Sequence, residues 1–145
     1  IHTKFLKVKL SESIWFGSIP ENENEVRQLR DVGITKFINL SDFTSDCNNL
    51  QWKFAFTKGL IYERRAFNGK TINLCESNEG KLSEAAKELQ RLVLANETIY
   101  IHSCVSRDLI IDCLLAYLIL YKRSSYEVAH KLLSNAVSKG IKGFK

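Results

Sequence analysis

One stretch of the sequence passes from a strand pattern through a short polar loop into a helix pattern: Ile99-Tyr100-Ile101-His102-Ser103-Cys104-Val105-Ser106-Arg107-Asp108-Leu109. Its first residues are β-branched or aromatic, which predicts a strand in the centre of a sheet. The apolar run over residues 109–121 predicts a largely buried helix. Backbone amides at the beginning of such a helix are unpaired and attract anions. We therefore expect any ligand site to lie at this loop.

Strand and helix patterns alternate through the rest of the chain. Strands are predicted at residues 5–10 and 14–16, which form a hairpin or a pair of strands, and at residues 36–40, 58–65 and 97–102. Helices are predicted at residues 22–32, 79–94, 109–121 and 125–138, followed by a frayed basic tail with Lys139, Lys142 and Lys145. This alternation predicts an α/β three-layer sandwich, with a central, mostly parallel sheet of about four or five strands flanked by helices.

The composition is that of a globular protein. The 145 residues, 45% apolar and 26% charged, predict a single domain over residues 1–145 and exclude disordered and fibrous classes. The 21 Lys and Arg residues exceed the 16 Asp and Glu residues by five, and this net charge of +5 permits an anionic partner without identifying one. The longest apolar run is interrupted by Asp112 and is too short to span a membrane.

The four cysteines (Cys47, Cys75, Cys104 and Cys113) are too sparse for a disulfide framework and lack the spacing of a zinc site. We therefore expect no metal and no cofactor, and an intracellular location that is cytoplasmic or nuclear. Because the chain begins at Ile1 and contains no Met, we also expect it to be a piece of a longer polypeptide.

Five segments of the sequence resemble motifs of a single protein family. They are the strand and loop over residues 14–20, the helix and strand over residues 29–40, the strand over residues 99–102, Ala116-Tyr117-Leu118-Ile119, and Ser125-Tyr126-Glu127-Val128-Ala129. In this order they resemble the dual-specificity branch of the cysteine-dependent tyrosine phosphatase superfamily. The resemblance implies a dual-specificity phosphatase-like fold and assigns the phosphate-binding loop to residues 102–109.

The resemblance also shows where the family's three catalytic groups would stand. The nucleophilic thiolate position is Ser103, and the arginine that holds the phosphoryl oxygens corresponds to Leu109. No Asp occurs between Asp46 and Asp108, so the best match to the general acid is Asn68, which cannot donate the proton. All three roles are lost, and we expect no catalytic residue. The resemblance therefore implies a pseudophosphatase.

A weak anion site is the remaining ligand hypothesis for the degenerate loop, which comprises His102, Ser103, Cys104, Val105, Ser106, Arg107, Asp108 and Leu109. Arg107 is the loop cation, and Arg64, Arg65 and Lys70 form a basic cluster that the resemblance places beside it. Solvated surface cations are the alternative interpretation of all four. Asp108 opposes anion binding by its charge.

Three functions follow from these residues. The first is a non-catalytic binding or scaffolding module whose partner is a protein, with a phosphorylated ligand as a weaker possibility. The second is an active dual-specificity phosphatase, either with its Cys replaced at position 103 or with Cys104 as an unusual nucleophile. The third is an RNA-backbone binder that uses Arg64, Arg65, Lys70 and the basic tail, and whose affinity falls steeply with salt.

Overall fold

The computed structural model describes residues 5–40, 61–64, 76–103 and 107–142. Five strands form one sheet: β1 (Lys7–Lys9), β2 (Ile14–Gly17), β3 (Lys36–Asn39), β4 (Ile61–Arg64) and β5 (Ile99–His102). Their order in the sheet is β1-β2-β5-β3-β4, and only β1 runs antiparallel to its neighbour. The predicted central strand is therefore β5, and the predicted, mostly parallel sheet is confirmed.

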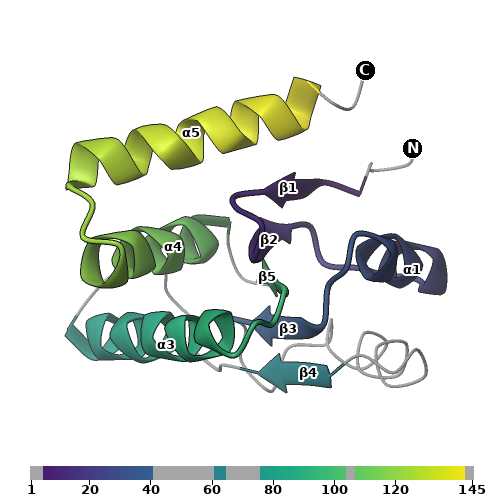
Figure 1. The fold of residues 1–145 in the computed structure, drawn as a ribbon, viewed down its shortest axis with the longest axis horizontal. Helices are drawn as coiled ribbons and strands as arrows, with labels where there is room; N and C mark the ends of the chain where they lie inside the picture. The colour runs from purple at the N-terminus through teal and green to yellow at the C-terminus, as the bar shows by residue number, and fades with distance from the viewer. Residues whose placement is uncertain (1–4, 41–60, 65–75, 104–106, 143–145) are drawn as a thin grey trace.

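Four described helices flank the sheet: α1 (Glu23–Asp31), α3 (Glu76–Leu94), α4 (Arg107–Tyr121) and α5 (Tyr126–Lys142). Figure 1 shows α1 on one side of the strands and α3, α4 and α5 on the other. Asn22 caps α1, because its side-chain oxygen accepts from the Glu25 amide at 2.9 Å. The predicted three-layer α/β sandwich is thus confirmed.

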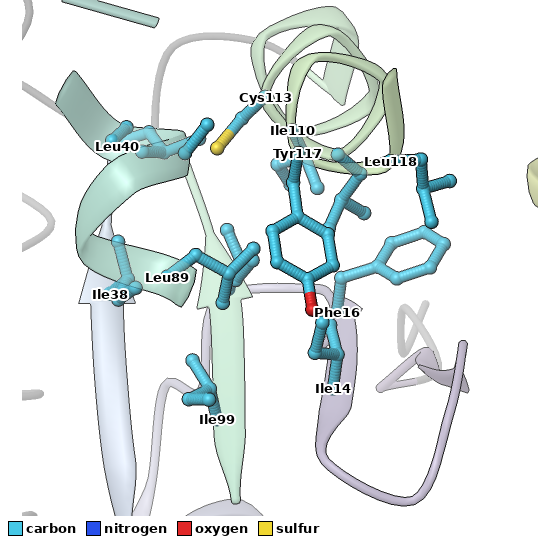
Figure 2. Packing of buried hydrophobic residues seen from close by; sticks show 14 of the residues in the cluster. Ile14, Phe16, Ile38, Leu40, Leu89, Ile99, Ile110, Cys113, Tyr117 and Leu118 are labelled. Carbon is cyan, nitrogen blue, oxygen red and sulfur yellow. The ribbon is translucent and has the colours of Figure 1, made fainter. Parts of the chain in front are cut away.

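The central strand divides its side chains between two apolar cores because successive residues of a strand point to opposite faces. Ile99 and Ile101 join the large core under α3, α4 and α5, whereas Tyr100 joins the smaller core under α1. Figure 2 shows the large core, where Ile38 and Ile99 of the sheet face Leu89 of α3 and Tyr117 of α4.

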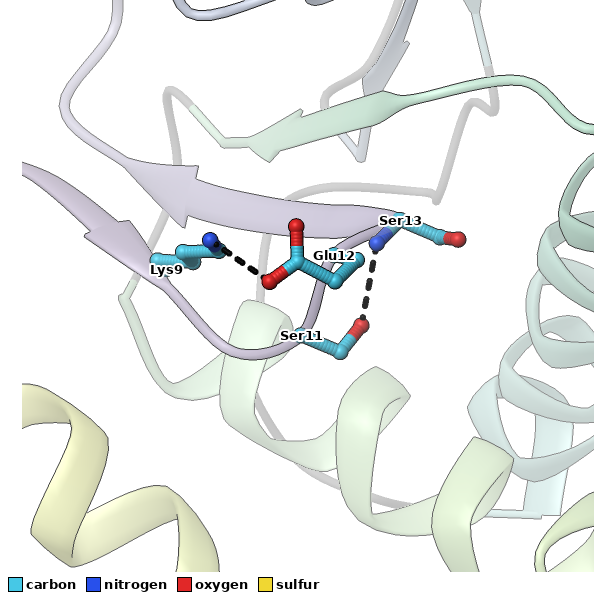
Figure 3. A network of polar contacts seen from close by, with 4 residues as sticks. All are labelled: Lys9, Ser11, Glu12 and Ser13. Atoms are coloured by element: carbon cyan, nitrogen blue, oxygen red, sulfur yellow. Dashed lines mark hydrogen bonds and ion pairs between the residues drawn. The ribbon is translucent and has the colours of Figure 1, made fainter.

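A tight hairpin joins β1 to β2, as predicted. The amide of Ser13 donates to Ser11 Oγ at 3.3 Å, and Lys9 Nζ pairs with Glu12 at 2.9 Å (Figure 3). The Lys9 ammonium also lies 5.9 Å from the centre of the Trp15 ring. These contacts fix the turn that places β1 antiparallel to β2.

The predicted frayed tail is wrong at Lys139 and Lys142, because α5 continues to Lys142, and Lys145 lies outside the described residues. Helix α5 contacts both α4 and β1. At Gly140 the helix lies so near β1 that a Cβ atom there would be 2.9 Å from Val8 Cγ2. Packing against Val8 therefore holds the end of the helix that the glycine pattern suggested would be frayed.

Candidate active site loop

The carboxyl ends of three parallel strands meet beside the predicted loop. His102, the last residue of β5, is in register with Asn39 of β3, which is in register with Arg64 of β4. Neighbouring strands are about 4.8 Å apart, so the Arg64 backbone lies roughly 10 Å from that of His102. Of the predicted basic cluster, Arg64 is thus brought to the edge of the sheet from which the loop leaves.

The imidazole of His102 is completely buried on the α1 side of the sheet. Its ring lies 6.0 Å from the ring of Phe37, edge-on, and 6.0 Å from the ring of Tyr100. Burial among these aromatic rings lowers the pKa of His102 to about 3. His102 is therefore neutral at physiological pH, and its cationic form makes no contribution to anion binding there.

Ser103 is the first residue after β5 and is half-buried. The strand end beside it is fixed, because the Leu40 amide donates to the His102 carbonyl at 2.9 Å. Three loop residues, Cys104, Val105 and Ser106, lie outside the described residues, and so do Arg65, Asn68 and Lys70. The backbone of Arg107 begins α4, which confirms that a helix begins directly after the loop.

Leu109, six residues after Ser103, lies in the first turn of α4 and is 3% exposed. It belongs to the large core together with Ile110, Cys113 and Leu114 (Figure 2 shows Ile110 and Cys113). Its side chain therefore serves hydrophobic packing, and it carries no donor for a bound oxyanion.

Two carboxylates stand on the first turns of α4. Asp108 is exposed, and Asp112 is partly buried. Desolvation, with a smaller contribution from the negative charge of Asp108, raises the pKa of Asp112. A dianion approaching the beginning of α4 would meet the same negative field, which weakens the attraction of the helix amides.

The phenol of Tyr100 is a structural group that sequence patterns alone did not indicate. Its hydroxyl contacts the Ser18 carbonyl at 2.5 Å and the Leu6 carbonyl at 3.3 Å. It thereby ties the central strand to the loop after β2, which begins at Ser18. Burial, followed by the charge of Glu25, raises the Tyr100 pKa well above its usual value, so the phenol stays a hydrogen-bond donor.

Cys113 carries the one thiol among the described residues, and this thiol is unsuited to nucleophilic attack. Its thiol is fully buried in the large core, and burial together with Asp112 raises its pKa to about 12. Among the described residues there is no group of three side chains that could hold a metal ion. Within the same ranges, no helix has the length and apolar character needed to cross a membrane.

Comparison with solved structures finds phosphatases that share this fold. Human DUSP28 superimposes with a TM-score of 0.66 at 18% identity, over 90% of this chain and 80% of that one. PTPMT1 in complex with PI(5)P gives a TM-score of 0.69 at 18% identity, with 92% and 84% covered. The Cydia pomonella PTP-2 phosphatase gives 0.68 at 13% identity, with 92% and 81% covered. No protein-family model matches the chain, and its sequence matches no curated protein.

Proposed function

Because the chain has the fold of the dual-specificity phosphatases, we propose that it is a pseudophosphatase: a domain that binds or scaffolds a protein partner without hydrolysing phosphate esters. The loop after β5, which in that fold performs the chemistry, would serve at most as a weak anion pocket. An intracellular location, cytoplasmic or nuclear, belongs to the same proposal, since four cysteines are too few for a disulfide framework.

The burial of Leu109 is the observation that carries this proposal. The position calls for a guanidinium that faces the loop and holds two oxygens of the transferring phosphoryl group. The leucine instead lies in the apolar core at 3% exposure. Losing the bidentate donor weakens both ground-state binding and transition-state stabilisation.

The residue after β5 supports the same conclusion. Ser103 stands where a thiolate would attack phosphorus, and a serine hydroxyl needs an activating base to do so. The nearest described imidazole, that of His102, lies buried among Phe37 and Tyr100. Burial also makes it a weak base, with a pKa of about 3.

A paired assay tests the proposal. The native chain and the variant Ser103→Cys/Leu109→Arg are compared for hydrolysis of para-nitrophenyl phosphate and for binding of tungstate by titration calorimetry. We expect the native chain to be inert and to bind tungstate weakly or not at all. We expect the double variant to gain tungstate binding, because it regains a thiolate and a bidentate donor at the beginning of α4.

Two further variants keep the test decisive if the buried arginine prevents folding. Ser103→Cys alone should fold, remain inert and react quickly with iodoacetamide, since a thiol at a helix beginning has a lowered pKa. Turnover by Ser103→Cys would instead identify a phosphatase whose Cys had been replaced. Turnover by the native chain that disappears in Cys104→Ser would refute the pseudophosphatase proposal and assign the nucleophile to Cys104.

A further inference from the structure

The turn between α4 and α5 forms an exposed corner. It lies apart from the candidate site in the loop after β5. We define the α4–α5 corner as residues 119–132, which comprise the last turn of α4, the connecting turn and the first two turns of α5. The connection is tight, because the amides of Lys122 and Ser124 both donate to the Leu118 carbonyl. Figure 1 shows this corner at the end of the molecule away from α1 and from the C-terminal end of α5.

Large apolar side chains gather at this corner. Of the eight exposed large apolar residues in the described ranges, five lie here: Ile119, Leu120, Tyr126, Val128 and Leu132. Their exposure runs from 38% at Ile119 to 60% at Val128. Single exposed apolar residues are normal on a soluble protein, but this corner holds most of the exposed large apolar side chains of the described residues, and such a concentration is typical of an interaction region.

The corner carries a net charge of +2, and most of the corner lies in the C-terminal segment whose net charge equals that of the whole chain. Residues 122–145 contain six Lys and Arg residues and one acid, Glu127, which is a net charge of +5. The preceding 121 residues contain fifteen basic and fifteen acidic residues and are neutral. Lys122, Arg123 and Lys131 are exposed cations within the corner itself, so its apolar side chains stand in a positive field.

The folded domain does not use these apolar side chains for its own core. The side of α5 that packs inward carries Ala129 and Leu133, which are buried in the large core. Val128 and Leu132 are spaced four residues apart and therefore share another side of the helix. This second apolar side is separate from the packing of α5 against the domain.

We propose that the α4–α5 corner is a docking surface for an acidic amphipathic helix of a partner protein. This inference rests on the proposed role as a binding domain and names the surface and the chemistry of the partner. Such a helix presents an apolar stripe for Leu120, Val128 and Leu132, with carboxylates beside it for Lys122 and Lys131. Complementary charge sets the orientation of the partner and raises its association rate.

Other occupants fit the corner less well. A second copy of this chain, related by twofold symmetry, would bring Lys122, Arg123 and Lys131 against the same cations. A membrane would require α5 to lie flat with an apolar outward side, but Glu127, Ser134 and Asn135 are exposed along it. RNA would use the cations but leave the aliphatic side chains of Leu120 and Leu132 without a matching surface.

The test uses the native chain and a synthetic three-heptad peptide with Leu at the a and d positions and Glu at e and g. Two controls are the same peptide with scrambled order and one with Lys in place of Glu. We expect the acidic amphipathic peptide to bind in calorimetry, with affinity that falls as salt rises. In amide NMR spectra, the largest shift changes should fall at residues 119–132. Failure of this peptide to bind, or equal binding of the Lys peptide, would overturn the proposal.

Matched variants locate the surface. Val128→Ser/Leu132→Ser and Lys122→Glu/Lys131→Glu should each weaken binding at least about tenfold, or roughly 1.4 kcal/mol. The control Leu94→Ser/Lys87→Glu alters an equally apolar and basic pair on α3, where Leu94 is 72% exposed, and should leave the affinity unchanged. Equal loss in the control, or preferential binding of phosphatidylserine vesicles or poly-uridine through the corner, would refute the proposal.

The corner lies outside the loop, so the two proposals fail separately. A native chain that hydrolyses phosphate esters but still binds the peptide would refute only the pseudophosphatase assignment. An inert chain whose corner binds no acidic helix would refute only the docking surface.

Discussion

The hydroxyl of Tyr100 lies 2.5 Å from the carbonyl oxygen of Ser18, a contact that joins the middle of the sheet to the loop after β2. The Ser18 amide in turn donates to the Leu6 carbonyl at 2.8 Å, and Ser18 Oγ accepts from the Leu6 amide at 3.1 Å. One buried phenol thereby anchors a reciprocal pair of bonds between Leu6, which precedes β1, and Ser18, which follows β2.

Replacing this phenol tests the anchor. Tyr100→Phe should lower the free energy of unfolding by about 1–3 kcal/mol, since it removes the phenol donor from the Ser18 carbonyl, whereas the Leu6 carbonyl keeps the Ser18 amide as its donor. Urea unfolding followed by circular dichroism measures the change. Tyr126→Phe, which alters an exposed phenol on α5, is the matched control and should change stability by less than about 0.5 kcal/mol. Equal effects of the two variants would show that the Tyr100 bonds contribute nothing.

Gly17 permits the close approach that brings Leu6 to Tyr100. A Cβ atom at Gly17 would lie 2.0 Å from the Leu6 carbonyl oxygen and 3.0 Å from the Tyr100 hydroxyl. Gly17→Ala should therefore destabilise the fold by at least about 3 kcal/mol, because backbone atoms must move. Gly33→Ala is the comparison, since Gly33 has a φ of 99° but open space around it, and should cost about 1 kcal/mol. A thermal melt in which Gly33→Ala unfolds at a lower temperature than Gly17→Ala would contradict this account.

His102 should make the stability depend on pH below neutrality. In the unfolded chain its imidazole takes up a proton near pH 6.5, whereas in the folded chain the pKa is about 3. Between these values the unfolded state binds more protons, so the free energy of unfolding falls as the pH falls. The stabilisation is complete above about pH 6.5, and the slope reaches at most about 1.4 kcal/mol per pH unit.

Denaturant titrations from pH 7 to pH 4 measure this slope. His102→Gln should be less stable at pH 7 but should lose the part of the slope that His102 contributes. His130→Gln, on the exposed side of α5, should retain the slope of the native chain. An unchanged slope in His102→Gln would assign the pH dependence to other groups.

Leu109 should behave as a core residue when it is shortened. Leu109→Ala should cost about 2–5 kcal/mol because it leaves a cavity beside Ile110 and Leu114. Leu120→Ala, a change of the same size on the same helix at a position that is 52% exposed, should cost less than about 1 kcal/mol. Similar losses at both positions in urea unfolding would show that Leu109 does not pack in the core.

Local patterns were sufficient to predict most of the fold. The hairpin, β3, β5 and the four helices all have apolar spacings that report strand or helix within a few residues. The end of α5 was mispredicted because its order depends on a contact between Gly140 and Val8, which lie at opposite ends of the sequence. No local pattern encodes such a distant contact.

The site was predictable in position but not in detail. The loop was expected after β5, and the structure shows β5 followed by Ser103 and then by α4 from Arg107. The direction of the Leu109 side chain was not predictable, because α4 is apolar on nearly all sides and its periodicity does not distinguish the core side from the loop side. The burial of His102 likewise depends on Phe37 and Tyr100, which only the assembled sheet brings together.

The packing of α5 on β1 has a consequence for how the chain is made. Val8 is synthesised more than a hundred residues before Gly140, its contact on α5. Contacts of such long sequence separation slow folding. The edge strand and part of the large core therefore stay uncovered on the nascent chain until α5 emerges, so the sheet completes its folding only after synthesis of this segment. Nascent chains stalled before residue 126 should accordingly recruit chaperones.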